Sequence, residues 1–216
     1  MLKMIEKMKR GGSCFVGSKR YVKANSKYLP DYSDKKESNY ILYLDASNLY
    51  GWAMSECLPY KNLKFVDISK DTLSIIWNTS NNNDKRYIIE CDLYFPEHAH
   101  NKLNEYPICP ENTTPLVEWF SEYQQQLGID NDILKSFEKA GEVKNAGANK
   151  LTPHLHPHKN YVIHYRNLKF IHELGVEIGQ IHRVISFVQK PWLQPYIEFN
   201  TNKRKEAKNE FETDFF

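Results

Sequence analysis

The four cysteines of this 216-residue chain are scattered, and no two of them form a C-x-x-C pair: they are Cys14, Cys57, Cys91 and Cys109. This spacing indicates neither a zinc site made of thiolates nor a disulfide framework. Apolar runs are short as well. No stretch approaches the roughly 20 apolar residues of a membrane span, and charges interrupt the opening MLKMIEKMKRGG, unlike a signal peptide. We therefore expect an intracellular protein with no membrane partner.

The charge of the chain is uneven. Residues 1–27 contain eight Lys or Arg and one acidic residue, Glu6, so this segment carries +7; since the whole chain carries +2, the remainder carries −5. A basic segment on a mildly acidic body is typical of a protein that contacts a polyanion through one region. A solvated terminus with no partner explains the same charges.

The hydrophobic pattern predicts a mixed α+β fold whose strands pair antiparallel. Strands are expected at residues 40–44, 63–68, 86–96, 160–165 and 176–188, and helices at residues 1–10, 70–79, 166–175 and 196–216. Gly175 is expected to end the helix before it. The strand at 40–44 is expected to be buried and to pair with residues 86–93.

A carboxylate, Asp45, directly follows the apolar run at 40–44, and Asn48, Leu49 and Tyr50 come soon after it. A carboxylate at the end of a strand can hold Mg²⁺, which takes one or two carboxylates together with substrate phosphates. The tyrosine ring would then lie near the sugar of a nucleotide. A buried aspartate that only accepts backbone hydrogen bonds fits the same spacing.

The stretch YILYLDASNLYGWAMSECLPY resembles D-x-x-S-L-Y-P, the first polymerase motif of the protein-primed family B DNA polymerases of Maverick or Polinton elements, related viruses and linear plasmids. The resemblance continues through NYVIHYRNLKF, IHRVISFVQKPWLQPYIEFNT and KRKEAKNEFETDFF, so it covers nearly the whole chain. It implies an antiparallel, palm-type sheet fragment with an inserted mixed α/β segment and a C-terminal fingers helix. A nuclear or virus-associated location is also compatible with this family.

The resemblance implies a role for each matching residue of the motif. Asp45 corresponds to the aspartate that binds the two catalytic Mg²⁺ ions, and Tyr50 to the tyrosine that excludes a ribonucleotide. Asn48 stands where the motif has serine, and Gly51 where it has proline. Asn48 and Leu49 are expected to bind the incoming triphosphate through backbone N–H groups, which do not depend on the side chain.

Two basic regions are expected to contact phosphates. The sequence KRGG is similar to the family's Y-x-G-G loop, with Lys9 in place of the tyrosine, and this implies contacts with template DNA. The DNA-binding residues are then Lys9, Arg10, Gly11, Gly12, Lys19, Arg20 and Lys23. In the last helix, Arg204, Lys205 and Lys208 are candidates for the β- and γ-phosphates of the nucleotide. A salt-bridged surface is the alternative there, because glutamates alternate with these residues.

The resemblance divides the chain into three segments. Residues 1–57 would hold the basic segment and part of the palm, residues 58–191 an insertion like the terminal-protein region, and residues 192–216 the start of the fingers. The family's third motif, Y-x-D-T-D-S, with its second metal-binding aspartate, does not occur in these residues. The expected function is therefore a fragment of a DNA polymerase that does not polymerise alone. Its partners would be template and primer DNA, a dNTP and a priming terminal protein.

Two other classes of function remain open. The chain can be a non-catalytic nucleic-acid-binding protein derived from a transposon polymerase, with Asp45 structural. A nuclease would need clustered carboxylates, and the sequence shows none. Histidines also alternate in HLHPHK, at His154, His156 and His158. No cysteine or carboxylate in their neighbourhood completes a metal shell, so we expect a loop of exposed imidazoles and no metal site. Trp119 is expected in the core.

Overall fold

The computed structural model describes residues 1–15, 17, 21–80, 84–123, 126 and 149–215. The elements, in chain order, are α1 (Leu2–Met8), α2 (Leu49–Ser55), β1 (Leu58–Val66), α3 (Thr72–Asn78), β2 (Lys85–Tyr94), α4 (Glu97–Leu103), β3 (Glu111–Thr113), the 3₁₀ turn η1 (Val117–Trp119), β4 (Lys150–Thr152), β5 (His158–His164), α7 (Tyr165–Glu173), β6 (Glu177–Lys190), α8 (Gln194–Glu206) and α9 (Glu210–Phe215).

The expected α+β class is confirmed. Four strands form an antiparallel sheet in the order β1-β6-β2-β5, and β3 pairs with β4 in a second, two-stranded sheet. Packing divides the chain into two compact units. The first contains Met1, Lys19–Glu90 and Ile181–Phe216, and the second contains Leu2–Ser18 and Cys91–Gln180. The three segments expected from the resemblance group the residues differently, and they stay a prediction.

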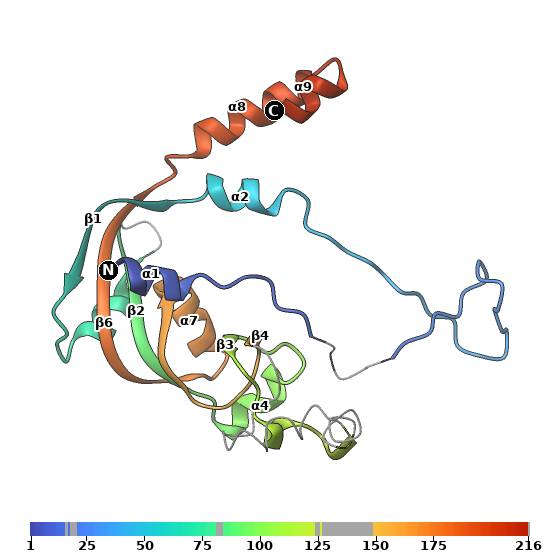
Figure 1. The fold of residues 1–216 in the computed structure, drawn as a ribbon, viewed down its shortest axis with the longest axis horizontal. Helices are drawn as coiled ribbons and strands as arrows, with labels where there is room; N and C mark the ends of the chain where they lie inside the picture. Colours follow the sequence, from blue (N-terminus) through green and yellow to red (C-terminus); the bar gives the residue numbers. More distant parts are fainter. Residues whose placement is uncertain (16, 18–20, 81–83, 124–125, 127–148, 216) are drawn as a thin grey trace, which may run out of the picture. The chain divides into compact units, whose positions relative to one another are not determined.

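The core of the first unit forms where β6 passes between β1 and β2. Figure 1 shows β1 running beside the long, curved β6, with which it pairs from Leu58↔Lys190 to Val66↔Val184. The buried apolar side chains are Tyr87, Ile88 and Ile89 of β2 and Val184, Ile185 and Phe187 of β6, whereas β1 is exposed along most of its length. Every residue of β2 from 86 to 93 is buried. Burial is therefore continuous along this strand and does not alternate from residue to residue, as expected for a strand covered on both faces.

The predicted strand at residues 40–44 is wrong. The segment has no regular secondary structure and its side chains are exposed, by 64% at Ile41 and 89% at Tyr43. The predicted pairing with 86–93 is also wrong, because the neighbours of β2 in the sheet are β6 and β5. Apolar residues at every position of a strand need cover on both faces, and no such cover encloses this run.

The polar connector before this run is held by one side chain. Asn25 is nearly buried, and its amide nitrogen donates to the carbonyl oxygens of Ser33, Lys36 and Glu37 at 3.0 to 3.2 Å. Its side-chain oxygen accepts from the N–H of Ser33 at 2.9 Å. An asparagine that bonds several nearby backbone groups stabilises a loop without a ladder of backbone hydrogen bonds.

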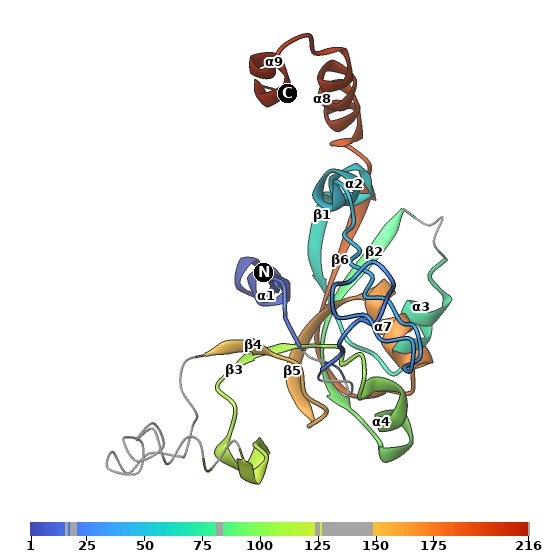
Figure 2. The same cartoon turned by 90° about the vertical axis from the view of Figure 1, so that its right-hand side faces the viewer.

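In the second unit, α1 and α7 both contact β5, and β3 lies beside β4 (Figure 2). The predicted first helix is confirmed as α1, whose Met4 is buried. The predicted stop at Gly175 is confirmed as well. Gly175 has a φ of 102°, a left-handed conformation that glycine adopts without the steric cost of a Cβ atom.

The predicted last helix is divided in two. The helix α8 ends at Glu206, and Asn209 begins α9 by accepting a hydrogen bond from the N–H of Glu212 at 2.9 Å through its side-chain oxygen. An asparagine that bonds the third following N–H is a strong N-cap. The local preference of Asn209 thus overrides the continuous helical pattern.

We predict that Arg183 stabilises the fold by compensating the charge of the buried Glu90. Two bonds join them, Arg183 Nε to Glu90 Oε2 at 2.5 Å and Nη2 to Oε1 at 2.9 Å, and the Glu90 side chain is 4% exposed. Removing one partner from a fully buried pair costs about 3–5 kcal/mol. Because the Arg183 side chain is 47% exposed, Arg183→Met should lower the free energy of unfolding by only about 1–2 kcal/mol in urea denaturation.

The matched control is Lys203→Met, which breaks the exposed ion pair between Lys203 and Glu206. Its denaturation midpoint should stay close to that of the unchanged protein, since exposed pairs contribute little. Equal midpoints for the two variants would contradict the role given to Arg183.

Candidate functional site

The residues of the polymerase-like motif lie just before and within α2. Asp45 is exposed in an irregular segment, and Asn48 precedes the helix with a left-handed backbone (φ 53°, ψ 38°). Leu49 and Tyr50 begin α2, with Tyr50 84% exposed. Asp45 is therefore not the buried aspartate that the alternative describes.

Asn48 and Gly51, the two residues that differ from the motif, lie next to each other in the structure. A Cβ atom on Gly51 would come within 2.3 Å of Asn48 Oδ1 and 2.5 Å of Asn48 Nδ2. The asparagine side chain therefore occupies the space next to the helix that any larger residue at position 51 would need. With the shorter serine of the motif at position 48, this space would be open to a proline at position 51, which the first turn of a helix accepts.

A pocket of about 530 Å³ joins this motif to the last helices. Figures 1 and 2 show α2 next to α8. Residues of α2 and its cap form one side, and residues of α8 and α9 form the other. The lining is Asn48, Tyr50, Gly51, Met54, Tyr196, Ile197, Asn200, Thr201, Arg204 and Phe215. The structure thus brings Arg204, which is distant in the sequence, to the same pocket as Asn48 and Tyr50, and all three were predicted to bind a nucleotide.

The other predicted nucleotide-binding residues do not line this pocket. Leu49 and Lys205 are exposed elsewhere on their helices, and the backbone N–H of Lys208 donates to Glu212 Oε2 at 2.8 Å. Neighbouring Lys203 forms an ion pair with Glu206. The alternative of a salt-bridged surface therefore holds for Lys203, whereas Arg204 lines the pocket.

The described residues among those predicted to bind DNA belong to both units. Arg10 packs within the second unit: its guanidinium lies 3.8 Å from the centre of the Tyr161 ring and its Nη1 donates to the Val162 carbonyl oxygen at 2.9 Å. Lys9, Gly11 and Gly12 are exposed beside it. Lys23 belongs to the first unit and forms an exposed ion pair with Asp31. Lys19 and Arg20 lie outside the described residues.

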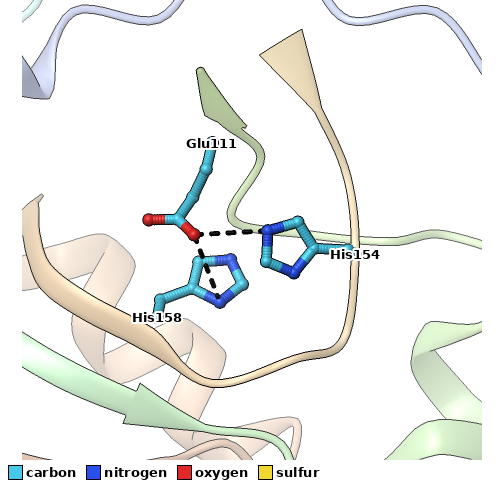
Figure 3. Close-up of side chains that lie close together, drawn as sticks. All are labelled: Glu111, His154 and His158. Carbon is cyan, nitrogen blue, oxygen red and sulfur yellow. Dashed lines mark ion pairs between the residues drawn. The ribbon is translucent and has the colours of Figure 1, made fainter. Parts of the chain in front are cut away.

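A group of side chains that the sequence reading missed could hold a metal ion. Glu111, His154 and His158 each offer one ligand atom, and these atoms lie within 4.8 Å of one another. Figure 3 shows one oxygen of the Glu111 carboxylate facing both imidazole rings. His154 Nε2 lies 3.2 Å and His158 Nδ1 lies 3.9 Å from Glu111 Oε2.

The expectation of a loop of exposed imidazoles is wrong for two of the three histidines. His158 is fully buried, the His154 side chain is 9% exposed, and only His156 is exposed. The carboxylate that seemed to be lacking comes from β3, whose Glu111 is paired with Thr152 of β4, two residues before His154. Opposite residues of an antiparallel pair lie side by side, and His154 follows β4 directly, so the pairing brings Glu111 near this histidine. The strand pairing, which the sequence did not reveal, is what joins them.

Burial and charge act in opposite directions on these groups. Burial lowers the pKa of His158, and the nearby Glu111 carboxylate offsets only part of this shift. Burial also raises the pKa of Glu111, but the hydrogen bond from His154 and the charges of His158 and His154 outweigh it, so the net pKa lies below its usual value. The carboxylate is therefore ionised and the buried ring favours its neutral form near pH 7. These are the states in which both groups bind metals.

Trp119, which was expected in the core, covers this group from the partly exposed turn η1. Its ring stacks on His156, with centroids 4.5 Å apart, and is tilted against His154 at 5.0 Å.

Within the described part of the chain, every helix falls short of the length and hydrophobicity that a membrane crossing requires.

Comparisons of the chain with protein-family models, with curated proteins and with solved structures find no match.

We predict that the effect of an alanine at position 51 depends on residue 48. Gly51→Ala alone should displace the Asn48 side chain and loosen the start of α2, where the Trp52 N–H bonds the Asn48 carbonyl oxygen at 3.0 Å. In an Asn48→Ser background the same change should tighten α2, since alanine favours a helix over glycine by about 1 kcal/mol. Hydrogen exchange of the Trp52 amide, followed by NMR, measures both effects. A change of the same sign in both backgrounds would refute the contact.

Proposed function

We propose that this chain is part of a DNA-directed DNA polymerase of the protein-primed family B type, and that the incoming dNTP binds between α2 and α8. The observation that carries the proposal is the pocket in which Asn48, Tyr50 and Arg204 meet. The resemblance assigns all three to the nucleotide, although Arg204 is far from the other two in the sequence.

The chemistry of the pocket suits a nucleoside triphosphate. Arg204 offers a planar, permanently charged guanidinium, which binds phosphate oxygens through paired hydrogen bonds. The aromatic side chains of Tyr50, Tyr196 and Phe215 offer apolar faces to a base and a sugar. A charged group at one end and rings around it match a ligand with a charged tail and a flat apolar head.

Asp45 fits one part of a Mg²⁺ site. Its exposed carboxylate is a hard oxygen ligand, and Mg²⁺ in such sites takes one or two carboxylates together with phosphates. Among the described residues, Asp45 joins no group of three metal ligands. In the complete enzyme, two Mg²⁺ ions would activate the attacking hydroxyl and stabilise the leaving pyrophosphate. Asp45 would supply one ligand, and a carboxylate outside this chain the other.

The proposed partners follow from the same reading. Template and primer DNA would contact exposed basic residues such as Lys9, and a priming terminal protein would contact the segment 58–191.

We expect Arg204→Gln to weaken binding of a dNTP with Mg²⁺ by about tenfold, since it removes a charged hydrogen-bond donor from the pocket. Lys208→Gln is the matched control: it removes the same charge from a neighbouring residue that does not line the pocket. Binding is measured by NMR titration of the chain, following amides of α2 and α8. Equal weakening by both changes would mean that general charge, and not this pocket, attracts the nucleotide.

Tyr50 is expected to discriminate between sugars in an enzyme that joins this chain to the missing motifs. A ring against the sugar excludes a 2′-hydroxyl, and the clash corresponds to roughly a hundredfold in selectivity. Tyr50→Ala should lower the ratio of kcat/KM for dNTP over rNTP by about that factor, chiefly through better use of rNTP. If the ratio stays constant, Tyr50 does not contact the sugar. Binding of dNTP by the chain would still test the pocket itself.

A further inference from the structure

We propose that Glu111, His154 and His158 bind one divalent transition metal ion of the zinc type. The three side chains lie in the second unit, on β3, on the segment after β4 and at the start of β5. The site does not depend on the proposed nucleotide pocket, whose residues belong to the first unit.

The ligand types and their spacing suit such an ion. Two imidazoles and one carboxylate are a common ligand set for Zn²⁺, with bonds of about 2.0–2.2 Å. Ligands at these lengths in a tetrahedron lie about 3.3–3.5 Å from one another. The observed separations from Glu111 Oε2, 3.2 Å to His154 Nε2 and 3.9 Å to His158 Nδ1, need to change by only a few tenths of an ångström.

The second nitrogen of His158 is held as it usually is in metal sites. Its Nε2 lies 2.7 Å from the carbonyl oxygen of Cys109. A metal-binding histidine generally donates its other N–H to such an acceptor, and this fixes the ring with its lone pair toward the ion. Cys109 has a φ of 56°, which is uncommon for a residue other than glycine. The fold therefore maintains an unfavourable backbone conformation at the residue that orients this ring.

The hydrogen bonds around His158 are not all compatible with a neutral ring in the absence of a cation. Its Nδ1 lies 2.6 Å from the His156 carbonyl oxygen while its Nε2 faces that of Cys109. A neutral imidazole carries a single N–H, so one nitrogen would point a lone pair at an oxygen. A cation at Nδ1 removes this repulsion.

Such an ion would act as a structural cross-link. It would tie the first residue of β3 to the turn that leads into β5, two parts of the chain that are distant in the sequence, beneath the cover of Trp119. Mg²⁺ does not suit the site, because it prefers oxygen ligands in an octahedral arrangement. A network without metal is the competing arrangement, with a protonated histidine paired to Glu111.

The experiment is a titration of the chelator-treated chain with Zn²⁺ against a fluorescent zinc chelator, followed by Co²⁺ absorption. We expect one Zn²⁺ per chain, unaffected by excess Mg²⁺, and a Co²⁺ spectrum without a thiolate charge-transfer band. Glu111→Gln keeps the shape of a partly exposed side chain and should weaken Zn²⁺ binding by about a hundredfold or more. His154→Gln should do the same.

His156→Gln is the matched control, because this ring stacks on Trp119 and only its backbone oxygen approaches His158. Its Zn²⁺ affinity should stay within about twofold of the unchanged chain, since no ligand side chain is removed. Absence of stoichiometric Zn²⁺ binding would overturn the proposal in favour of the protonated network. A thiolate band, or full affinity in Glu111→Gln, would overturn it by placing the ion elsewhere.

Discussion

Two buried carboxylates of β2, Glu90 and Asp92, constrain the strands around them. They lie two residues apart and so point to the same side of the strand, and each has a cationic partner within its own unit. Glu90 binds Arg183 of β6, and Asp92 accepts from Lys159 Nζ at 2.8 Å and from the Asn160 N–H at 3.0 Å. A slip of one residue would turn each carboxylate to the opposite face and leave its charge buried and uncompensated. The charged pairs thus help to define the register of this strand, whose one face carries Arg86, Glu90 and Asp92 and whose other face is apolar.

The helices and strands with a clear apolar pattern could be predicted from the sequence. The strands β2, β5 and β6 and the helix α7 lie where the apolar pattern indicated them, because each buries those side chains in its own unit. The run at 40–44 has an equally apolar composition and forms no strand, since a strand also needs a neighbour with free hydrogen-bonding groups. The break before α9 had a local signal, Asn209, that the continuous helical pattern obscured.

The candidate sites were harder to predict from the sequence than the helices and strands. Local sequence was sufficient to single out Asn48 and Tyr50, yet their meeting with Arg204 depends on the contact between α2 and α8, which no pattern encodes. The histidines were visible as a cluster, whereas Glu111 was not, because it joins them through the pairing of β3 with β4. The carboxylate looked absent only because it was distant in the sequence. A search for ligands close together in the sequence cannot find a site that strand pairing assembles.

The exposed apolar run at 40–44 also bears on solubility. Tyr-Ile-Leu-Tyr-Leu is uncharged, contains no proline and favours extended structure, which is the composition of segments that stack into intermolecular sheets. Asp45 places a negative charge directly at its end, where charged residues limit such stacking. Neutralising Asp45 therefore removes a barrier to self-association as well as a carboxylate. Any loss of activity in such a variant has to be separated from a loss of soluble protein.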